Sequence, residues 1–360
     1  MIRHSSPMRY LRKIVAKKKR LSKNQVRRVQ SNQNKRLKKI DEKHWDESEL
    51  GPQLQGVVIS RFGQHADIED ENGKIERCNL RRGVKSLVTG DRVVWRAGNE
   101  AFHGISGVIE AVHPRKTVLT RPDYYDGIKP IAANIDHIII VSSIAPEFSR
   151  NIIDRYLVAC EDIGITPIIV LNKSDLLDPE SAKIIEQELQ SYRDIGYQVL
   201  YSSMHGHGLD ALKSVMKDKT NIFVGQSGVG KTSLLNMLLP EVNAITGEIS
   251  ENSGLGKHTT TTARLYHFID GGDLIDSPGI REFSLWHLEA ERIASGFIEF
   301  RPFLGGCRFR DCTHQGDPGC ALVAAVEQGK IDDARYRSFL RILDTMDDAK
   351  NARNRNPNTY

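Results

Sequence analysis

The sequence predicts a multidomain α/β protein with a small β-barrel, a parallel α/β sheet and a helical, metal-binding C-terminal part. Three observations support this fold class. Short alternating strands run from Leu54 to His113, continuous apolar strands alternate with helices beyond Pro114, and a Cys/His cluster follows Ala290. The chain has 360 residues, the length of two or three domains.

The positive charge is concentrated at the N-terminus. Residues 1–45 hold 16 Lys and Arg against Asp41 and Glu42, a net charge of +14, so that the rest of the +5 chain carries −9. A segment with so few large apolar side chains cannot offset the entropy lost on folding. We expect residues 1–48 to be a disordered basic arm that binds nucleic acid. A solubilising tail is the alternative.

Several classes of protein are excluded. No apolar run approaches the roughly 18 residues of a membrane helix, and no apolar segment of a secretory signal follows the basic N-terminus. Five cysteines, three of them between Cys307 and Cys320, are too few for a disulfide scaffold. We therefore expect a cytoplasmic protein without a membrane partner.

Residues 52–114 are predicted to form the barrel. Turn signals such as Glu71-Asn72-Gly73 separate five short alternating segments. The predicted strands are Val57–Ile59, Ala66–Glu69, Lys74–Asn79, Asp91–Arg96 and Ser106–Val112. An OB-fold suits five short strands, although an SH3-like barrel would show much the same pattern.

Residues 115–290 are predicted to form a parallel sheet with helices on both faces. The predicted strands are Ile138–Val141, Pro167–Leu171, Gln198–Tyr201 and Asn221–Val224. The predicted helices are Ile152–Ile163, Ala182–Ile195, Leu209–Met216 and a long helix that begins at Lys231. Helical residues 291–350 and a polar tail, 351–360, complete the chain.

A phosphate-binding loop lies between a predicted strand and a predicted helix. The sequence from Gly225 to Thr232 matches G-x-x-x-x-G-K-[ST], in which backbone N–H groups hold phosphates. Lys231 would reach the β- and γ-phosphates and Thr232 would ligate Mg²⁺. The predicted nucleotide-binding residues of this loop are Gly225, Gln226, Ser227, Gly228, Val229, Gly230, Lys231, Thr232 and Ser233.

The base is predicted to be guanine. Asn172-Lys173-Ser174-Asp175 follows a strand, and the Asp175 carboxylate can accept the N1 and N2 protons of guanine, which adenine does not present. Asn172 would hold the base edge and the Lys173 stem would lie over the purine. Ser202 and Ser203, after the next strand, would close a loop over the base.

Two further motifs would bind the γ-phosphate and Mg²⁺. Asp276-Ser277-Pro278-Gly279 gives D-x-x-G at a strand end, with Asp276 toward Mg²⁺ and the Gly279 N–H toward the γ-phosphate. A threonine of Thr259–Thr262, with Thr260 as the candidate, would bind the same ion. An ordinary GTPase places its base motifs last, whereas here they come first, so the domain is circularly permuted.

The D-x-x-G motif would act as a switch, a loop that orders when the γ-phosphate is present. No side chain directly after this switch can orient the catalytic water. Ile280 stands where many GTPases carry a water-positioning Gln, so we expect weak intrinsic hydrolysis that a partner stimulates. His258 is the candidate catalytic side chain, with Lys231 and Thr232; an exposed loop histidine is the alternative. Ile280–Leu288 leads from the switch into the C-terminal part and would transmit the nucleotide state.

The Cys/His cluster predicts one structural zinc ion. Cys307, Cys312, His314 and Cys320 supply four tetrahedral ligands within fourteen residues, with no open position for catalysis. Asp311 and Asp317 lie among them as candidate outer partners. Cys78 and Cys160 fall in apolar patterns and are predicted to be core residues.

Together these motifs closely resemble the RsgA or YjeQ family of circularly permuted GTPases of small ribosomal subunit biogenesis. The resemblance extends over about residues 21–345. Its marks are Leu21-Ser22-Lys23 with the basic arm, the barrel, Lys257–Thr261, Asp276–Ile280, the two other nucleotide motifs and the Cys/His spacing. Residues 1–20 would extend beyond the usual start, with Met8 as an alternative initiator.

The resemblance implies binding to the immature 30S subunit and 16S rRNA, and late-stage GTP hydrolysis to GDP stimulated by the subunit. We expect a monomer. Phe62, Trp95 and Phe102 are the aromatic candidates for RNA contact on the barrel. The alternative is an RNA-binding adaptor that uses GTP and GDP as sensing ligands with negligible turnover. Asp175 argues against an ATP-driven remodeller.

Overall fold

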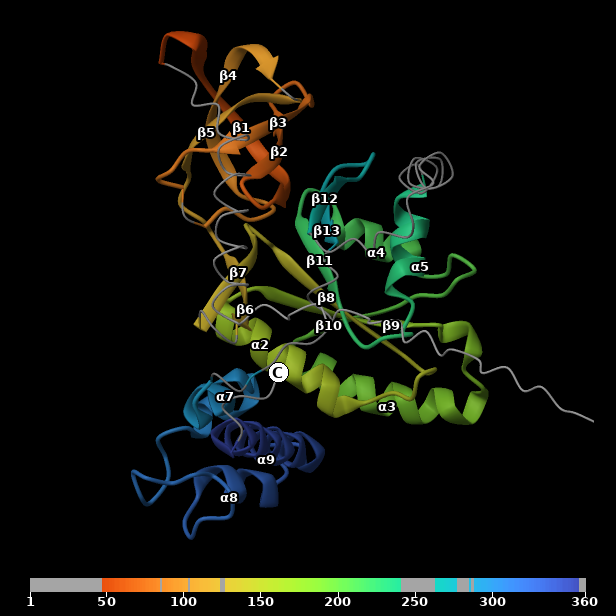
Figure 1. Cartoon of the computed structure of the whole chain (residues 1–360). Helices are drawn as coiled ribbons and strands as arrows, with labels where there is room; N and C mark the ends of the chain where they lie inside the picture. Colours follow the sequence, from red (N-terminus) through yellow and green to blue (C-terminus); the bar gives the residue numbers. More distant parts are fainter. Residues whose placement is uncertain are drawn as a thin grey trace, which may run out of the picture. The chain divides into compact units, whose positions relative to one another are not determined.

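The computed structural model describes residues 47–84, 86–102, 104–123, 127–240, 263–276, 285 and 288–355 (Figure 1). Contacts divide the chain into two units, residues 1–49 and 50–360. Of the first unit, the 3-10 helix Glu47–Glu49 is described. The predicted arm up to residue 46, and with it His258, Thr260 and Gly279, lies outside the described residues.

The barrel has the five predicted strands. They are β1 (Leu50–Phe62), β2 (His65–Asp70), β3 (Ile75–Leu80), β4 (Arg92–Phe102) and β5 (Ile105–Val112). Strand β1 pairs with both β2 and β4, which closes the sheet, and β3 pairs parallel to β5. This closed five-stranded barrel fits the predicted OB-fold.

The barrel core is built from side chains that alternate along the strands. Val58, Ile68, Cys78, Trp95 and Ile109 are among its buried members. Trp95 is 2% exposed and donates its indole N–H to the Gln55 carbonyl oxygen, so it belongs to the core and not to an RNA-facing surface. Phe62 is 39% exposed, with the Arg77 guanidinium 5.4 Å from its ring centroid.

A two-stranded hairpin follows the barrel. Strands β6 (Val118–Asp123) and β7 (Gly127–Ala133) pair antiparallel in a separate sheet. No strand was predicted here. Both strands contain a proline, at Pro122 and Pro130, and proline lowers the strand signal of a sequence because it cannot donate a ladder hydrogen bond.

The second sheet is parallel, as predicted, except at one edge. Its strands are β10 (Gln198–Tyr201), β9 (Thr166–Asn172), β8 (His137–Ser143), β11 (Thr220–Val224), β13 (Asp273–Asp276) and β12 (Arg264–His267), in this spatial order. Strand β12 is antiparallel to β13 and pairs with β1 of the barrel at Ser60 and Arg264. The barrel and the parallel sheet therefore share one continuous set of strands.

Helices cover both faces of this sheet (Figure 1). Ile138 and Ile140 pack with α2 (Arg150–Ile163) and α3 (Pro179–Ile195), whereas Ile139 and Val141 pack with α4 (Leu209–Met216) and α5 (Lys231–Leu238). The period of two in β8 explains why its sequence is apolar throughout.

Helix α5 is shorter than predicted. It begins at Lys231 as expected but ends at Leu238, two residues before Pro240. Proline is common just beyond a helix end because it cannot continue the backbone hydrogen bonds. The prediction of a long helix was therefore wrong.

The C-terminal part consists of α7 (Ala290–Gly296), the 3-10 helix η3 (Ile298–Phe303), α8 (Ala321–Glu327) and α9 (Asp333–Arg355). Its core includes Phe297, Phe300 and Phe339, together with Val158 and Ala159 of α2. Helix α2 therefore packs on the sheet with one face and on the C-terminal helices with the other. No helix in the described ranges is long and apolar enough to cross a bilayer.

Candidate nucleotide and metal sites

The predicted nucleotide motifs follow the carboxyl ends of neighbouring parallel strands. Asn172 ends β9, Ser202 follows β10, Gly225 follows β11 and Asp276 ends β13. Because these strands are parallel, their carboxyl ends lie at one edge of the sheet, where open α/β sheets bind ligands.

The phosphate loop requires its glycines. Gly225 has φ 139°, and a Cβ there would overlap the Val141 carbonyl oxygen. Gly230 has φ 96°, and a Cβ there would overlap the Asn172 side-chain amide. Lys231 Nζ donates to the Gly225 carbonyl oxygen at 2.7 Å and also contacts the Gln226 carbonyl oxygen, so the ammonium lies over the loop. Ser227 of the loop and Thr232 in the first turn of α5 are both exposed.

The base motif touches the phosphate loop directly. Asn172 is fully buried and donates from Nδ2 to the Val229 carbonyl oxygen at 2.9 Å. Lys173, at φ 59°, donates from Nζ to the Gly228 carbonyl oxygen at 2.7 Å. These contacts join two motifs that are 55 to 57 residues apart in the sequence. The two motifs therefore lie side by side at this edge of the sheet.

The serine loop is joined to the base motif by a short network. Ser202 donates to Asn172 Oδ1 at 3.0 Å, and Ser174 Oγ donates to the Ser202 carbonyl oxygen at 3.0 Å. Ser202 and Ser203 are each 1% exposed. Ser202 and Ser174 thus link the loop after β10 to the motif that begins at Asn172.

Sequence reasoning missed two neighbours of the base motif. His205 Nε2 lies 3.7 Å from Asp175 Oδ2, and the His205 side chain is 73% exposed. The Ala145 carbonyl oxygen accepts a hydrogen bond from Lys173 Nζ. The loop from Ser202 to Gly208 could have indicated His205, but a lone loop histidine has no spacing signal. A carbonyl oxygen has no sequence signal at all.

Asp276 lies in the last position of β13, opposite Arg264 of β12. The rest of its D-x-x-G motif, including Gly279, lies outside the described residues, as do Thr260 and His258. Beyond this gap Leu285 and Leu288 are 3% and 1% exposed and pack in the C-terminal core. The polypeptide that follows the motif is therefore anchored in the C-terminal helices.

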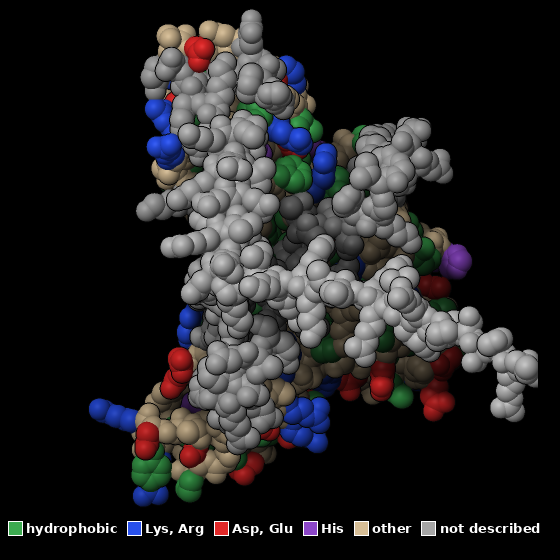
Figure 2. Space-filling model, in the orientation of Figure 1, with side chains coloured by type: hydrophobic (Ala, Val, Ile, Leu, Met, Phe, Trp, Pro, Cys, Tyr) green, Lys and Arg blue, Asp and Glu red, His purple; other side chains and the backbone are tan. Residues whose placement is uncertain are grey.

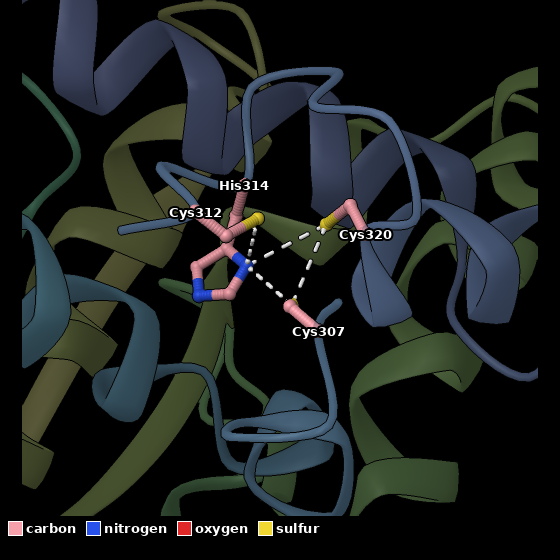
Figure 3. A group of neighbouring side chains, drawn as sticks. All are labelled: Cys307, Cys312, His314 and Cys320. Atoms are coloured by element: carbon pink, nitrogen blue, oxygen red, sulfur yellow. Dashed lines mark hydrogen bonds between the residues drawn. The ribbon is translucent and has the colours of Figure 1, made fainter. Parts of the chain in front are cut away.

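The four predicted metal ligands converge (Figure 3). His314 Nδ1 lies 3.4 Å from Cys307 Sγ, 3.5 Å from Cys312 Sγ and 3.5 Å from Cys320 Sγ, and the sulfurs of Cys307 and Cys320 are 4.0 Å apart. Tetrahedral zinc, with Zn–S of about 2.3 Å and Zn–N of about 2.0 Å, separates its ligand atoms by about 3.5–3.8 Å. The cluster therefore fits a tetrahedral metal.

A second layer of contacts orients these ligands. Asp317 Oδ2 accepts hydrogen bonds from the Thr313 backbone N–H and hydroxyl at 3.0 and 2.8 Å, and it lies 3.5 Å from Cys312 Sγ. The Thr313 hydroxyl lowers the pKa of Asp317 most. Burial lowers the pKa of His314, which favours the neutral imidazole that binds metals. Asp317 is thus the predicted outer partner that the structure places at the cluster, whereas Asp311 is exposed.

The two other cysteines lie in cores, as predicted. Cys78 and Cys160 are both 0% exposed, and burial raises the pKa of each thiol well above its ordinary value. Neither has the exposed, electropositive surroundings of a reactive cysteine.

This chain is similar in sequence to a protein family and to several of its members. The family model of the RsgA GTPase matches residues 112–286. The small ribosomal subunit biogenesis GTPase RsgA 1 of Vibrio parahaemolyticus is 61% identical over 337 residues, which are 92% of this chain and 95% of that protein. The RsgA of Haemophilus influenzae is 57% identical over 339 residues, covering 93% of this chain and 98% of that protein.

Solved structures agree with the sequence relatives. YjeQ from Thermotoga maritima superposes with a TM-score of 0.66 at 33% identity, covering 82% of this chain and 99% of that one. YloQ, described as a circularly permuted GTPase, superposes with a TM-score of 0.66 at 29% identity, covering 85% and 99%.

Proposed function

Because the chain belongs to the RsgA family of small ribosomal subunit biogenesis GTPases, we propose that it binds the immature 30S subunit through 16S rRNA. When the subunit stimulates it, the protein would hydrolyse GTP to GDP. It would thereby act as a late maturation checkpoint. The family relatives carry the ribosomal part of the proposal, and the direct contact of Asn172 and Lys173 with the phosphate loop carries the guanine-nucleotide part. We further propose that it works as a cytoplasmic monomer.

The guanine nucleotide would lie across these joined motifs. The loop from Gly225 to Ser233 would hold the phosphates by its N–H groups, with Lys231 at the β- and γ-phosphates. Asp175 would accept the two guanine protons. Thr232, Asp276 and Thr260 would hold Mg²⁺, which supplies charge neutralisation at the phosphates when bound.

Hydrolysis would need help from outside the phosphate loop. Ile280 cannot orient a water molecule, because its side chain has no hydrogen-bonding group. We propose His258 as the catalytic side chain that the subunit brings into position. The anchoring of Leu285 and Leu288 in the C-terminal core supports a nucleotide-dependent signal to those helices.

The N-terminal arm would supply most of the attraction to rRNA. Between residues 50 and 114 eight Lys and Arg balance eight Asp and Glu, so the barrel is neutral while residues 1–45 carry +14. Figure 2 shows Lys and Arg side chains over the barrel strands, but several of them pair with acids, as Arg77 does with Asp67 at 2.7 Å. Recognition of RNA backbone and shape would therefore outweigh reading of bases.

The metal at the Cys/His cluster is proposed to be zinc in a structural role. Three thiolates and one imidazole leave no position for a substrate. With the metal bound, the loops around Cys307 and Cys320 would be fixed to each other and to α9 through Tyr336, whose hydroxyl donates to the His314 carbonyl oxygen at 2.7 Å.

Turnover tests this function. GTP hydrolysis should be slow alone, rise many-fold with 30S subunits, and rise much less with 50S subunits or 70S ribosomes. Equal rates in all four conditions, with GTP and GDP still bound, would instead support the adaptor.

His258→Ala should abolish the stimulated rate and preserve GDP affinity; a full stimulated rate would remove His258 from the mechanism.

A further inference from the structure

In the sequence, the hairpin of β12 and β13 lies between the threonine run Thr259–Thr262 and the D-x-x-G motif. Strand β12 begins at Arg264, two residues after the threonine run, and β13 ends at Asp276, the first residue of D-x-x-G. Its register is fixed by pairs from Arg264 opposite Asp276 to His267 opposite Asp273. Any displacement of β12 therefore moves Asp276.

The barrel grips the start of this hairpin. Ser60 Oγ and Thr89 Oγ1 each donate to the carbonyl oxygen of Ala263 at 3.0 Å, and both side chains belong to residues that are at most 2% exposed. A Cβ on Gly90 would approach Ile275 Cδ1 to 3.2 Å, so the barrel also packs closely on β13. Two buried hydroxyl groups on one carbonyl oxygen form a specific anchor.

The barrel also holds the other end of β12. His267 Nε2 lies 2.6 Å from Glu69 Oε2 of β2, and His267 Nδ1 lies 2.6 Å from Asp273 Oδ1 of β13. An imidazolium can donate to both carboxylates at once, whereas a neutral ring can donate to one. Glu69 is 19% exposed and Asp273 30%, so this bridge is partly shielded from solvent.

We propose that Glu69 of the barrel is a positioning residue for GTP hydrolysis, because it fixes, through His267 and Asp273, the strand that carries Asp276 to the nucleotide. The inference deepens the proposed function, on which it rests. It gives the barrel a role in the chemistry besides RNA binding: displacement of β2 would reach the γ-phosphate side of the site, while the guanine motifs on β9 and β10 would be unaffected.

The charges around His267 agree with this role. Glu69 faces it from the barrel and Asp273 from the hairpin, while Lys213 of α4 and Asp270 of the hairpin turn line the same groove. The hydrogen bond that His267 donates to Asp273 is the largest cause that raises the pKa of His267. The bridge is therefore complete below this raised pKa and is lost as the pH rises through it.

Glu69→Gln tests the proposal, with Glu71→Gln as the matched control. Glu71 is an exposed carboxylate in the turn that follows β2. We expect Glu69→Gln to weaken binding of a non-hydrolysable GTP analogue about five- to tenfold and to lower kcat, while GDP affinity stays within twofold. The loss of kcat with rising pH should shift to lower pH, because one of the two charges that raise the pKa of His267 is gone.

Two outcomes would overturn the inference. One is that Glu69→Gln and Glu71→Gln behave alike. The other is that Glu69→Gln weakens GDP and the analogue equally, which would show a merely structural contact. Glu69→Asp, which keeps the charge, should recover part of the analogue affinity. Failure of the proposed function would appear differently, as wild-type protein that 30S subunits do not stimulate.

Discussion

Asp175 is the side chain on which, in the proposed function, the choice of guanine would depend. Its carboxylate follows the buried Asn172, and the 3-10 turn Ser174–Leu176 holds the residue at the sheet edge. Asp175→Asn should weaken GTP and GDP binding about 10- to 150-fold, since a hydrogen bond to a charged group contributes about 1.5–3 kcal/mol. Calorimetric titration measures this loss.

Xanthine nucleotides provide the control for Asp175→Asn. Xanthine has a carbonyl where guanine has its 2-amino group, so the asparagine amide can donate to it. The variant should therefore bind XDP more tightly than the wild type does. Loss of affinity for both bases would show that the substitution had only damaged the loop.

The residues of the candidate nucleotide site could be named from the sequence, but their contacts with one another could not. The fixed spacing of the phosphate loop and the tetrapeptide at Asn172 points to the side chains that we propose to meet a nucleotide. The bond from Lys173 to the Gly228 carbonyl oxygen depends on φ 59° at Lys173 and on the strand order. Neither property is written in local sequence. His205 was missed for the same reason.

At the scale of elements, α9 is fixed to α2 by a buried ion pair. Arg335 is 0% exposed and pairs with Asp154 of α2, also 0% exposed, and with Glu299 at 2.7 Å. Arg335→Met should lower the free energy of unfolding by about 3–5 kcal/mol, because it leaves the buried Asp154 carboxylate without its cationic partner. Denaturant titration monitors this change.

Arg337 supplies the control on the same helix. Its guanidinium is 64% exposed and pairs with Asp333 one turn away. Arg337→Met should change the free energy of unfolding by at most about 0.5 kcal/mol, as exposed helical pairs do. If both variants had the same small effect, the Arg335 pair would not hold the two helices together.

The metal loop is the second element with a measurable role. Chelation should release about one zinc per chain, and His314→Gln should lower the midpoint of thermal unfolding, while Gln315→Ala at the exposed neighbour should not. A metal present at a thousandfold excess over its Kd stabilises by about 4 kcal/mol. Substitution of the metal by Co²⁺ gives an independent readout, since Co²⁺ in a tetrahedral thiolate site absorbs visible light whereas Zn²⁺ does not. A chain that binds no metal would contradict the assignment.

Elements with a clear period were predicted well, and those without one were not. The barrel strands and β8 to β11 alternate or run apolar between turn signals, so tertiary packing only reinforced what the pattern indicated. The hairpin of β6 and β7 has no central strand, which makes its prolines tolerable and its signal weak. Helix α5 ends two residues before Pro240, a residue that cannot continue the helical hydrogen bonds whatever the apolar period around it.

At the scale of the whole molecule, the charge difference between arm and body should dominate the salt dependence of subunit binding. Each phosphate contact made by the arm adds about 0.7–0.9 to the slope of log K against log salt. Removal of residues 1–45 should therefore reduce the magnitude of this slope by several units. Filter binding at several salt concentrations measures the change.

A shuffled arm separates charge from sequence in that experiment. An arm of the same composition in scrambled order should restore the slope, because backbone phosphates are contacted without regard to sequence. An unchanged slope after removal of residues 1–45 would mean that the arm serves only solubility.

The packing of α2 on both sides has a consequence for protein synthesis. Val158 and Ala159 are buried in a cluster whose other buried members among the described residues run from Leu285 to Met346. A polypeptide that stopped just after Gly279 would leave this surface of α2 exposed to water while its nucleotide motifs were already complete. Interrupted translation should thus yield a fragment with an exposed apolar surface, which chaperones and proteases would bind. It should not yield an isolated GTPase domain that hydrolyses GTP independently of the ribosome.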